Sequence, residues 1–198
     1  MLFVVTGPSG CGKSTIIHHV MSDLRHVRFS VSHTTRPKRP SEQEGRDYYF
    51  VSRPEFERMI EKRKFLEWAE VHGHYYGTSK REIIQKGKSG DLILDIDVQG
   101  ARQMRSLRKN AVFVFILPPA YGELKRRLAE RGEEGRDVIE RRLRNARREI
   151  RQYALFDYIV INNRLDRAVL ELESIILSTR CRLDVRKREI APIVRSFK

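Results

Sequence analysis

The stretch Gly7-Pro8-Ser9-Gly10-Cys11-Gly12-Lys13-Ser14 gives the strongest indication of fold in this chain. It matches the pattern G-x-x-x-x-G-K-[ST] at every fixed position, and it stands between an apolar run at residues 2–5 and a helical pattern at residues 16–24. A strand, a glycine-rich turn and a helix are the setting in which this motif binds phosphate. The alternative, a glycine-rich turn that merely precedes Lys-Ser, is disfavoured by the flanking elements.

The residue types of this loop suit a nucleoside triphosphate. Its glycines let successive backbone N–H groups point inward as an anion-binding nest. The following helix directs unpaired N–H groups and the positive end of its dipole at the same phosphates. Lys13 can reach the β- and γ-phosphates, and Ser14 can place a hydroxyl on Mg²⁺. The sequence therefore predicts a triphosphate site with magnesium at the start of the chain.

Length and composition indicate a single globular domain. The chain has 198 residues, 40% hydrophobic and 33% charged, which is enough for a sizeable core. No apolar run approaches the roughly 20 residues that span a bilayer, and no basic segment followed by an apolar one suggests a secretory signal. The two cysteines are Cys11 and Cys181, and a disulfide at Cys11 would obstruct the loop. We expect a reduced, cytoplasmic protein without a membrane partner.

The formal net charge of +14 invites a nucleic-acid interpretation. A protein that grips several phosphates also needs many cations, however, and much of the excess can be solvated surface. The sequence shows no RNA- or DNA-binding motif, so we expect no nucleic-acid partner. The basic stretch at residues 180–198 is interpreted as a tail or a terminal helix with a charged face.

Apolar runs at residues 2–5, 92–96, 112–117 and 158–161 are typical of buried parallel strands, and residues 29–32 could form a fifth. Helical patterns separate them, which predicts an α/β fold with a central parallel sheet between helices. Residues 33–88 differ, because short alternating strands and turns dominate. Within them, the capping box Ser52-Arg53-Pro54-Glu55 predicts a helix that ends near Lys62. This region is interpreted as an insertion folded against the core.

Residues 123–151 form a charged helical region that residues 131–135 interrupt with two glycines. A mobile flap and a solvated, salt-bridged helical hairpin are both compatible with this pattern, and composition alone favours the hairpin.

Two turn-rich stretches contain groups that match phosphate. Ser32, Arg36 and Arg39 stand in one, and Tyr48 stands in the other. Arginine forks bind phosphate oxygens bidentately, and hydroxyls add donors. Taken alone, each stretch is an ordinary loop.

In combination with further stretches, the sequence resembles guanylate kinases, a family of P-loop nucleoside monophosphate kinases, over nearly its whole length. The matching stretches are the loop at 7–14, residues 29–36, 45–51, 65–70 (Phe-Leu-Glu-Trp-Ala-Glu), 75–78 (Tyr-Tyr-Gly-Thr), 94–100 (Leu-Asp-Ile-Asp-Val-Gln-Gly), 115–119 and 159–162.

The resemblance implies a P-loop NTPase-type three-layer core, a small mixed α+β GMP-binding insertion and a helical lid in one domain. The core would comprise residues 1–32, 89–123 and 152–198, the GMP-binding region 33–88, and the lid 124–151. The implied reaction is Mg²⁺-dependent phosphoryl transfer from ATP to GMP, and also to dGMP, which gives ADP and GDP. ATP and GMP are the implied partners, and the choice between monomer and homo-oligomer stays open.

The resemblance also assigns site residues. Those that would bind ATP are Gly7, Pro8, Ser9, Gly10, Cys11, Gly12, Lys13, Ser14, Thr15 and Asn162. Those that would bind GMP are Ser32, Arg36, Arg39, Tyr48, Glu67, Tyr76, Gly77, Thr78, Asp95 and Asp97. The implied catalytic residues are Lys13, Arg36, Arg131 and Arg142, with Arg127 and Arg147 as weaker lid candidates. Magnesium would be held by Ser14 and, through water, by Asp95.

Glu67 would read guanine, because a carboxylate can accept from N1–H and the exocyclic N2–H₂ of that base. Adenine would present an unprotonated N1 there and be repelled. Thr78 would donate to O6. Whether Asp95 or Asp97 serves the metal, and which serves the base, stays open. A phosphate acceptor needs no general base, so His33 is expected to be a loop or packing residue.

The chain departs from the family at Asn162-Asn163, where Asn-Asp is common, and this leaves the details of ATP binding open. Three other interpretations compete with a guanylate kinase. They are a non-catalytic scaffold module that binds peptides, a P-loop kinase with another acceptor, and an RNA-binding protein. The intact Lys13 and Ser14 disfavour the first, and Glu67 with Thr78 disfavours the second.

Overall fold

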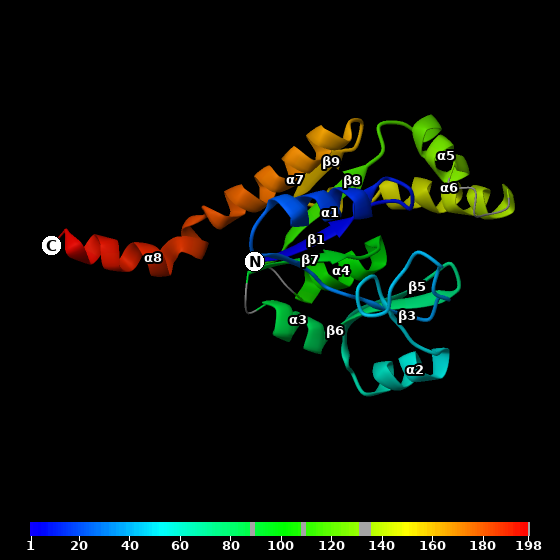
Figure 1. The fold of residues 1–198 in the computed structure, drawn as a ribbon, viewed down its shortest axis with the longest axis horizontal. Coiled ribbons are helices and arrows are strands. Elements are labelled where there is room, and N and C mark those ends of the chain that lie inside the picture. Colours follow the sequence, from blue (N-terminus) through cyan, green and yellow to red (C-terminus); the bar gives the residue numbers. More distant parts are fainter. Residues whose placement is uncertain (88–89, 108–109, 131–135, 198) are drawn as a thin grey trace.

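The computed structural model of this protein describes residues 1–87, 90–107, 110–130 and 136–197. Its centre is a five-stranded sheet in the order β2-β7-β1-β8-β9 (Figure 1). All neighbouring strands in it are parallel, so the predicted α/β fold with a central parallel sheet is confirmed. The strands are β1 (Leu2–Thr6), β2 (Val27–Phe29), β7 (Asp91–Asp95), β8 (Val112–Leu117) and β9 (Tyr158–Ile161).

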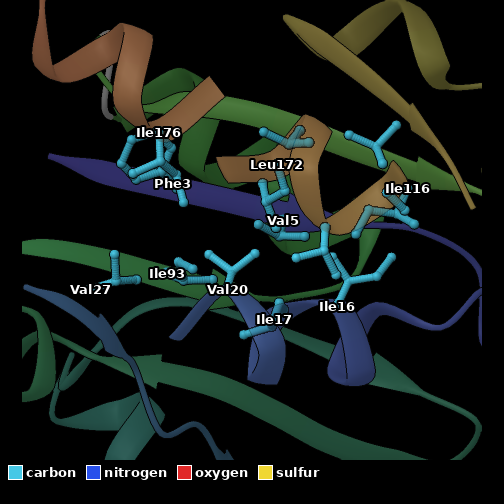
Figure 2. Packing of buried hydrophobic residues seen from close by; sticks show 14 of the residues in the cluster. Phe3, Val5, Ile16, Ile17, Val20, Val27, Ile93, Ile116, Leu172 and Ile176 are labelled. Carbon is cyan, nitrogen blue, oxygen red and sulfur yellow. The ribbon is translucent and has the colours of Figure 1, made fainter. Parts of the chain in front are cut away.

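Alternate side chains of the strands cover the two faces of this sheet, as the twofold period of a strand requires. Phe3 and Val5 pack on one face with helices α1 (Lys13–Asp23) and α7 (Leu165–Arg180). Val4 packs on the other face with α4 (Val98–Leu107). Helices on both faces make three layers and bury the central strands of the sheet, whereas the edge strand β9 keeps Tyr158, Ile159 and Ile161 exposed. Figure 2 shows the first face, with Ile16, Ile17 and Val20 of α1 and Leu172 and Ile176 of α7 around Phe3, Val5 and Ile93.

The carboxyl ends of the strands bring segments that are distant in sequence to one edge of the sheet. β1 leads into the phosphate loop, β7 ends at Asp95, and Asn162 follows β9. In open parallel sheets this is the edge where ligands bind. The sheet therefore gathers several of the predicted site residues at one place.

The insertion contains a second sheet in the order β4-β3-β6-β5. β6 pairs antiparallel with both β5 and β3, whereas β3 and β4 are parallel. Ser52 Oγ accepts a hydrogen bond from the Glu55 amide at 3.3 Å, so the predicted helix start is confirmed. The elements are β3 (His33–Thr34), β4 (Tyr49–Phe50), α2 (Arg53–Glu61), β5 (Phe65–Val71), β6 (His74–Ser79) and α3 (Lys80–Lys86).

The charged region forms two helices, α5 (Tyr121–Glu130) and α6 (Arg136–Ile150), that pack through a small apolar cluster of Leu124, Leu128, Leu143 and Ala146. Figure 1 shows them projecting from the core. Residues 131–135, where the sequence predicted an interruption, lie outside the described residues. A short 3₁₀ helix (Tyr153–Leu155) then leads back to β9.

One sequence prediction needs correction. The fifth strand is present but comprises Val27–Phe29 instead of residues 29–32, because the Val31 amide donates to the Glu82 carboxylate at 3.0 Å instead of to a strand. The basic C-terminal stretch forms a terminal helix, α8 (Leu183–Ser196), which has no buried residue and extends away from the central sheet (Figure 1). Within the described ranges, no helix combines the length and hydropathy needed to cross a membrane.

Leu172 tests the packing of α7 on the sheet. Its side chain is fully buried, whereas Leu170 on the same helix is 61% exposed. We expect Leu172→Ala to lower the free energy of unfolding by about 2–5 kcal/mol, since it removes buried methyl groups and leaves a cavity. Leu170→Ala is the matched control and should change it by less than about 0.5 kcal/mol. Urea unfolding measures both, and equal effects would contradict the assigned packing.

Candidate functional site

The phosphate loop has a backbone that only glycine accommodates at two positions. Gly10 and Gly12 have φ of 88° and 94°, in the left-handed region. A Cβ on Gly12 would stand 2.3 Å from Asn162 Nδ2, and one on Gly10 would stand 2.8 Å from Leu128 Cδ2. Both conformation and space therefore require these glycines.

Side chains that are distant in sequence hold this loop in place. Asn162 Nδ2 donates to the Cys11 carbonyl at 2.7 Å, and Arg127 Nη2 donates to the Asn162 carbonyl at 3.1 Å. Glu123 accepts from Arg127 Nε at 2.7 Å and so fixes that guanidinium. Asn162, predicted to border ATP, thus contacts the loop backbone. The part played by Arg127 is not visible in the sequence, because arginines crowd this region.

The side chains of Lys13 and Asp95 lie close together at the phosphate loop. Lys13 Nζ donates to the Gly7 carbonyl at 2.7 Å and lies 3.9 Å from Asp95 Oδ1. Burial raises the pKa of Asp95, and the charge of Lys13 opposes that shift. Ser14 and Thr15 are exposed in the first turn of α1, so their hydroxyls are accessible to a ligand.

The donors at this position fit Mg²⁺. The Ser14 hydroxyl and the Asp95 carboxylate are hard oxygen ligands, which this ion prefers. Among the described residues there is no group of three or more His, Cys, Asp or Glu that could hold a metal ion. Mg²⁺ is usually bound by one or two protein oxygens together with phosphates and water, so these two side chains suffice.

The predicted phosphate-binding side chains of the insertion lie together. The Arg36 guanidinium lies 5.4 Å from the centre of the Tyr48 ring, and the Tyr48 and Tyr76 rings are 5.9 Å apart. Burial, followed by the charge of Asp95, raises the pKa of Tyr48, which therefore stays a neutral donor. Ser32 is also buried. Its carbonyl accepts a hydrogen bond at 2.9 Å from the amide of Tyr49, which follows Tyr48 in the chain.

Glu42 joins this cluster although sequence reasoning missed it. One carboxylate oxygen accepts from Arg36 Nη2 at 2.6 Å, and the other accepts from the Arg39 amide at 2.8 Å. Burial alone would raise the pKa of Glu42, but the hydrogen bonds from Arg36 and Arg39 outweigh it and lower that pKa. A single carboxylate thus orients Arg36 and the backbone that carries Arg39. A glutamate in a polar loop gives no such signal in the sequence.

Glu67 lies at the centre of a buried polar pocket. It is only 3% exposed, and its Oε1 accepts from the Thr78 amide at 2.9 Å. A Cβ on Gly100 would stand 2.3 Å from Glu67 Oε2 and 3.3 Å from Asp97 Oδ1, so both carboxylates face the same glycine. The Thr78 hydroxyl is buried and has no hydrogen-bond partner among the described residues. Glu67 is therefore a buried carboxylate and not a surface one.

Burial raises the pKa of Glu67 to about 7, and the nearby Asp97 adds to the shift, whereas hydrogen bonding to Thr78 opposes it. Asp97 itself accepts from the Gly100 amide at 2.9 Å at the start of α4. The structure therefore places Asp95 beside Lys13 and Asp97 beside Glu67, a division that the sequence left open.

The remaining predicted residues differ in their surroundings. Gly77 is buried, and a Cβ there would meet the Phe65 and Phe56 rings at 2.9 and 3.0 Å. His33 packs against the Tyr49 ring at 4.8 Å, as expected of a packing residue. Arg142 is half-buried in α6 and has an interaction partner. Arg131 lies outside the described residues.

The chain is similar to guanylate kinases in both sequence and structure. A family model described as "Guanylate kinase" matches residues 1–179. A guanylate kinase of Geobacter metallireducens is 48% identical over 183 residues, which are 92% of this chain and 90% of that protein. A crystal structure of guanylate kinase from Anaplasma phagocytophilum has a TM-score of 0.77 and 30% identity, and the match covers 96% of this chain and 92% of that one.

A more distant likeness links the chain to the SH3-kinase fragment of tight junction protein 3. The TM-score is 0.51 at 11% identity, and the match covers 91% of this chain and 57% of that chain. At this identity the likeness shows a shared fold alone.

The raised pKa of Glu67 predicts how stability depends on pH. The folded state holds a proton on Glu67 up to about pH 7, whereas the unfolded state releases it near pH 4.3. Glu67 therefore stabilises the fold most at low pH, and this contribution disappears as pH rises through about 7. The free energy of unfolding of Glu67→Gln minus that of wild type should be larger at pH 8 than at pH 5, by up to about 3 kcal/mol. Urea unfolding at both values tests this, and an equal difference at the two would contradict it.

Proposed function

Because this chain belongs to the guanylate kinase family and is an ATP:GMP phosphotransferase, we propose how its residues divide the reaction ATP + GMP → ADP + GDP. The phosphate loop takes ATP, the insertion takes GMP, and the lid covers the transferred group. The observation that carries this proposal is the buried Glu67 carboxylate, which accepts from the Thr78 amide and faces Gly100 shortly after the end of β7.

The donor site is formed by the loop and the first turn of α1. Backbone N–H groups of residues 9–15 bind the phosphates of ATP, and Lys13 leaves the Gly7 carbonyl to contact the β- and γ-oxygens. Asn162 maintains the loop in this shape through the Cys11 carbonyl. The adenine then lies near the end of β9.

Ser14 and, through water, Asp95 would hold Mg²⁺. When bound, the ion neutralises charge on the phosphates and orients them. Asp95 is assigned to the metal because it lies next to Lys13, and Asp97 is assigned to the base because it lies next to Glu67.

The acceptor phosphate binds to Arg36, Arg39, Ser32, Tyr48 and Tyr76. Glu42 keeps Arg36 oriented before GMP arrives, so less conformational entropy is lost on binding. The acceptor oxygen is already anionic, and no side chain has to remove a proton from it.

Guanine enters the pocket of Glu67. Its N1–H and N2–H₂ donate to the carboxylates of Glu67 and Asp97, and the Thr78 hydroxyl donates to O6. Without the base, this hydroxyl lacks a partner and Glu67 is costly to ionise. Adenine would leave both groups unsatisfied, and buried polar groups without partners are strongly penalised.

Phosphoryl transfer itself requires positioning and charge stabilisation more than covalent chemistry. Lys13 and Arg36 stabilise the negative charge on the transferred group from the two substrate sites. Arg142 and Arg131 add positive charge from the lid and exclude water, which limits hydrolysis of ATP. Cys11 and Cys181 are free thiols, and this supports a reducing, cytoplasmic location.

A panel of acceptors tests the proposed function. Purified protein with ATP and Mg²⁺ should release ADP rapidly with GMP or dGMP, more slowly with IMP, which lacks the exocyclic amine, and very slowly with AMP, CMP and UMP. Glu67→Ala should lower kcat/KM for GMP by about 100-fold or more and largely remove the preference over AMP, since the buried donors of guanine lose their acceptor. Release of ADP with another acceptor but not with GMP would overturn the assignment.

Glu42→Gln tests the orientation of Arg36. The amide keeps one acceptor oxygen but loses the charge that fixes the guanidinium, so we expect KM for GMP to rise about 3- to 20-fold while KM for ATP stays unchanged. Glu44→Gln is the control, because Glu44 lies in the same loop and its carboxylate accepts a hydrogen bond from the Phe50 amide at 3.1 Å. A rise in both Michaelis constants would indicate general disruption of the site.

A further inference from the structure

A hydrogen bond links the lid to the hairpin that carries the base pocket. Asn145 Nδ2 of α6 lies 3.2 Å from His72 Nδ1 at the β5–β6 turn, a distance that fits an amide N–H donating to a ring nitrogen. Both residues line a cavity of about 200 Å³, together with Asp97 and Glu149. The contact therefore spans the space between the two regions that the reaction must bring together.

The hairpin end of this contact is a tight two-residue turn. His72 and Gly73 have φ of 54° and 85°, and they connect the paired residues Val71 and His74. Two central residues with positive φ form the tight turn that best matches the twist of a hairpin. The same two strands carry Glu67 and Thr78, so the backbone of His72 directly continues the strands of the base pocket.

The lid end of the contact belongs to a polar face of α6. Arg142, Asn145 and Glu149 are spaced three and four residues apart and so share one side of the helix. The adjacent side carries Leu143 and Ala146, which pack on α5. Asn145 and Glu149 line the same cavity as Asp97, so this polar face looks toward the base pocket. Burial raises the pKa of Glu149, with Lys13 opposing and Asp97 adding to the shift.

We propose that Asn145 and His72 are positioning residues whose hydrogen bond sets the lid helix against the base-binding hairpin, and with it the place of Arg142. This inference rests on the proposed function and adds the connection between its two halves. Because guanine binds to the strands that end at His72, order imposed on the hairpin by GMP is transmitted to α6. By linkage, lid position and GMP affinity must then influence each other equally.

A double-mutant cycle tests the connection. His72→Gly removes the ring yet keeps a residue that tolerates positive φ, and Asn145→Ala removes the amide from an otherwise compatible helix position. Each should lower kcat/KM for GMP by about 3- to 10-fold, the effect of one lost hydrogen bond. The double variant should be no worse than the singles. Affinity for ATP, measured without GMP by calorimetry, should stay within about twofold of wild type, since the loop is untouched.

Arg144→Ala is the matched control, because Arg144 lies on the same helix, is 63% exposed and pairs with Glu140; it should leave kcat/KM for GMP unchanged. Single variants that behave as wild type, or effects that multiply in the double variant, would overturn the proposal. Lost ATP affinity would show a merely structural role for these residues and would also overturn it. If wild type itself failed to phosphorylate GMP, the proposed function would fail instead, so the two failures are distinguishable.

Discussion

The site depends first on the shape of the loop between β1 and α1. Its backbone turns through left-handed conformations at Gly10 and Gly12, and there is no room for a side chain at either position. A loop of this kind does not keep its shape alone, because a nest of inward N–H groups repels itself electrostatically until an anion arrives. Asn162 and Arg127, from the end of β9 and from α5, secure it through carbonyl groups. The central sheet therefore also shapes the site, since the order of its strands brings Asn162 to the loop.

The second constraint is the burial of a carboxylate, which loses its hydration. Glu67 is buried with Thr78 as its hydrogen-bonding neighbour and a second carboxylate nearby, so its ionised form is unfavourable in the absence of ligand. Such a group selects strongly between ligands, because the correct base restores its hydrogen bonds and an incorrect base leaves it unpaired. Arg36 illustrates the opposite arrangement. Its charge is already satisfied by Glu42, which keeps it oriented for an incoming phosphate.

The lid connects these two environments. α5 contacts the loop through Arg127, whereas α6 contacts the hairpin through Asn145. An apolar cluster packs α5 and α6 against each other. As the proposed lid, a pair of helices in contact with both proposed substrate sites would respond to the occupancy of either, which fits a reaction in which premature closure over ATP alone would waste it.

The sequence by itself determined the phosphate loop, the parallel α/β core, the capped helix after Ser52 and the resemblance on which the site residues were assigned. These features are local: a motif, a hydrophobic period or a cap is written in residues a few positions apart. Only the tertiary structure separated Asp95 from Asp97, identified the contacts of Glu42, Arg127 and Asn162, and showed that α8 buries no residue. Each of these depends on which charged or polar group is nearest in space. In a chain with 40 Lys and Arg, spacing along the sequence offers many candidate partners for every carboxylate, and packing alone decides among them.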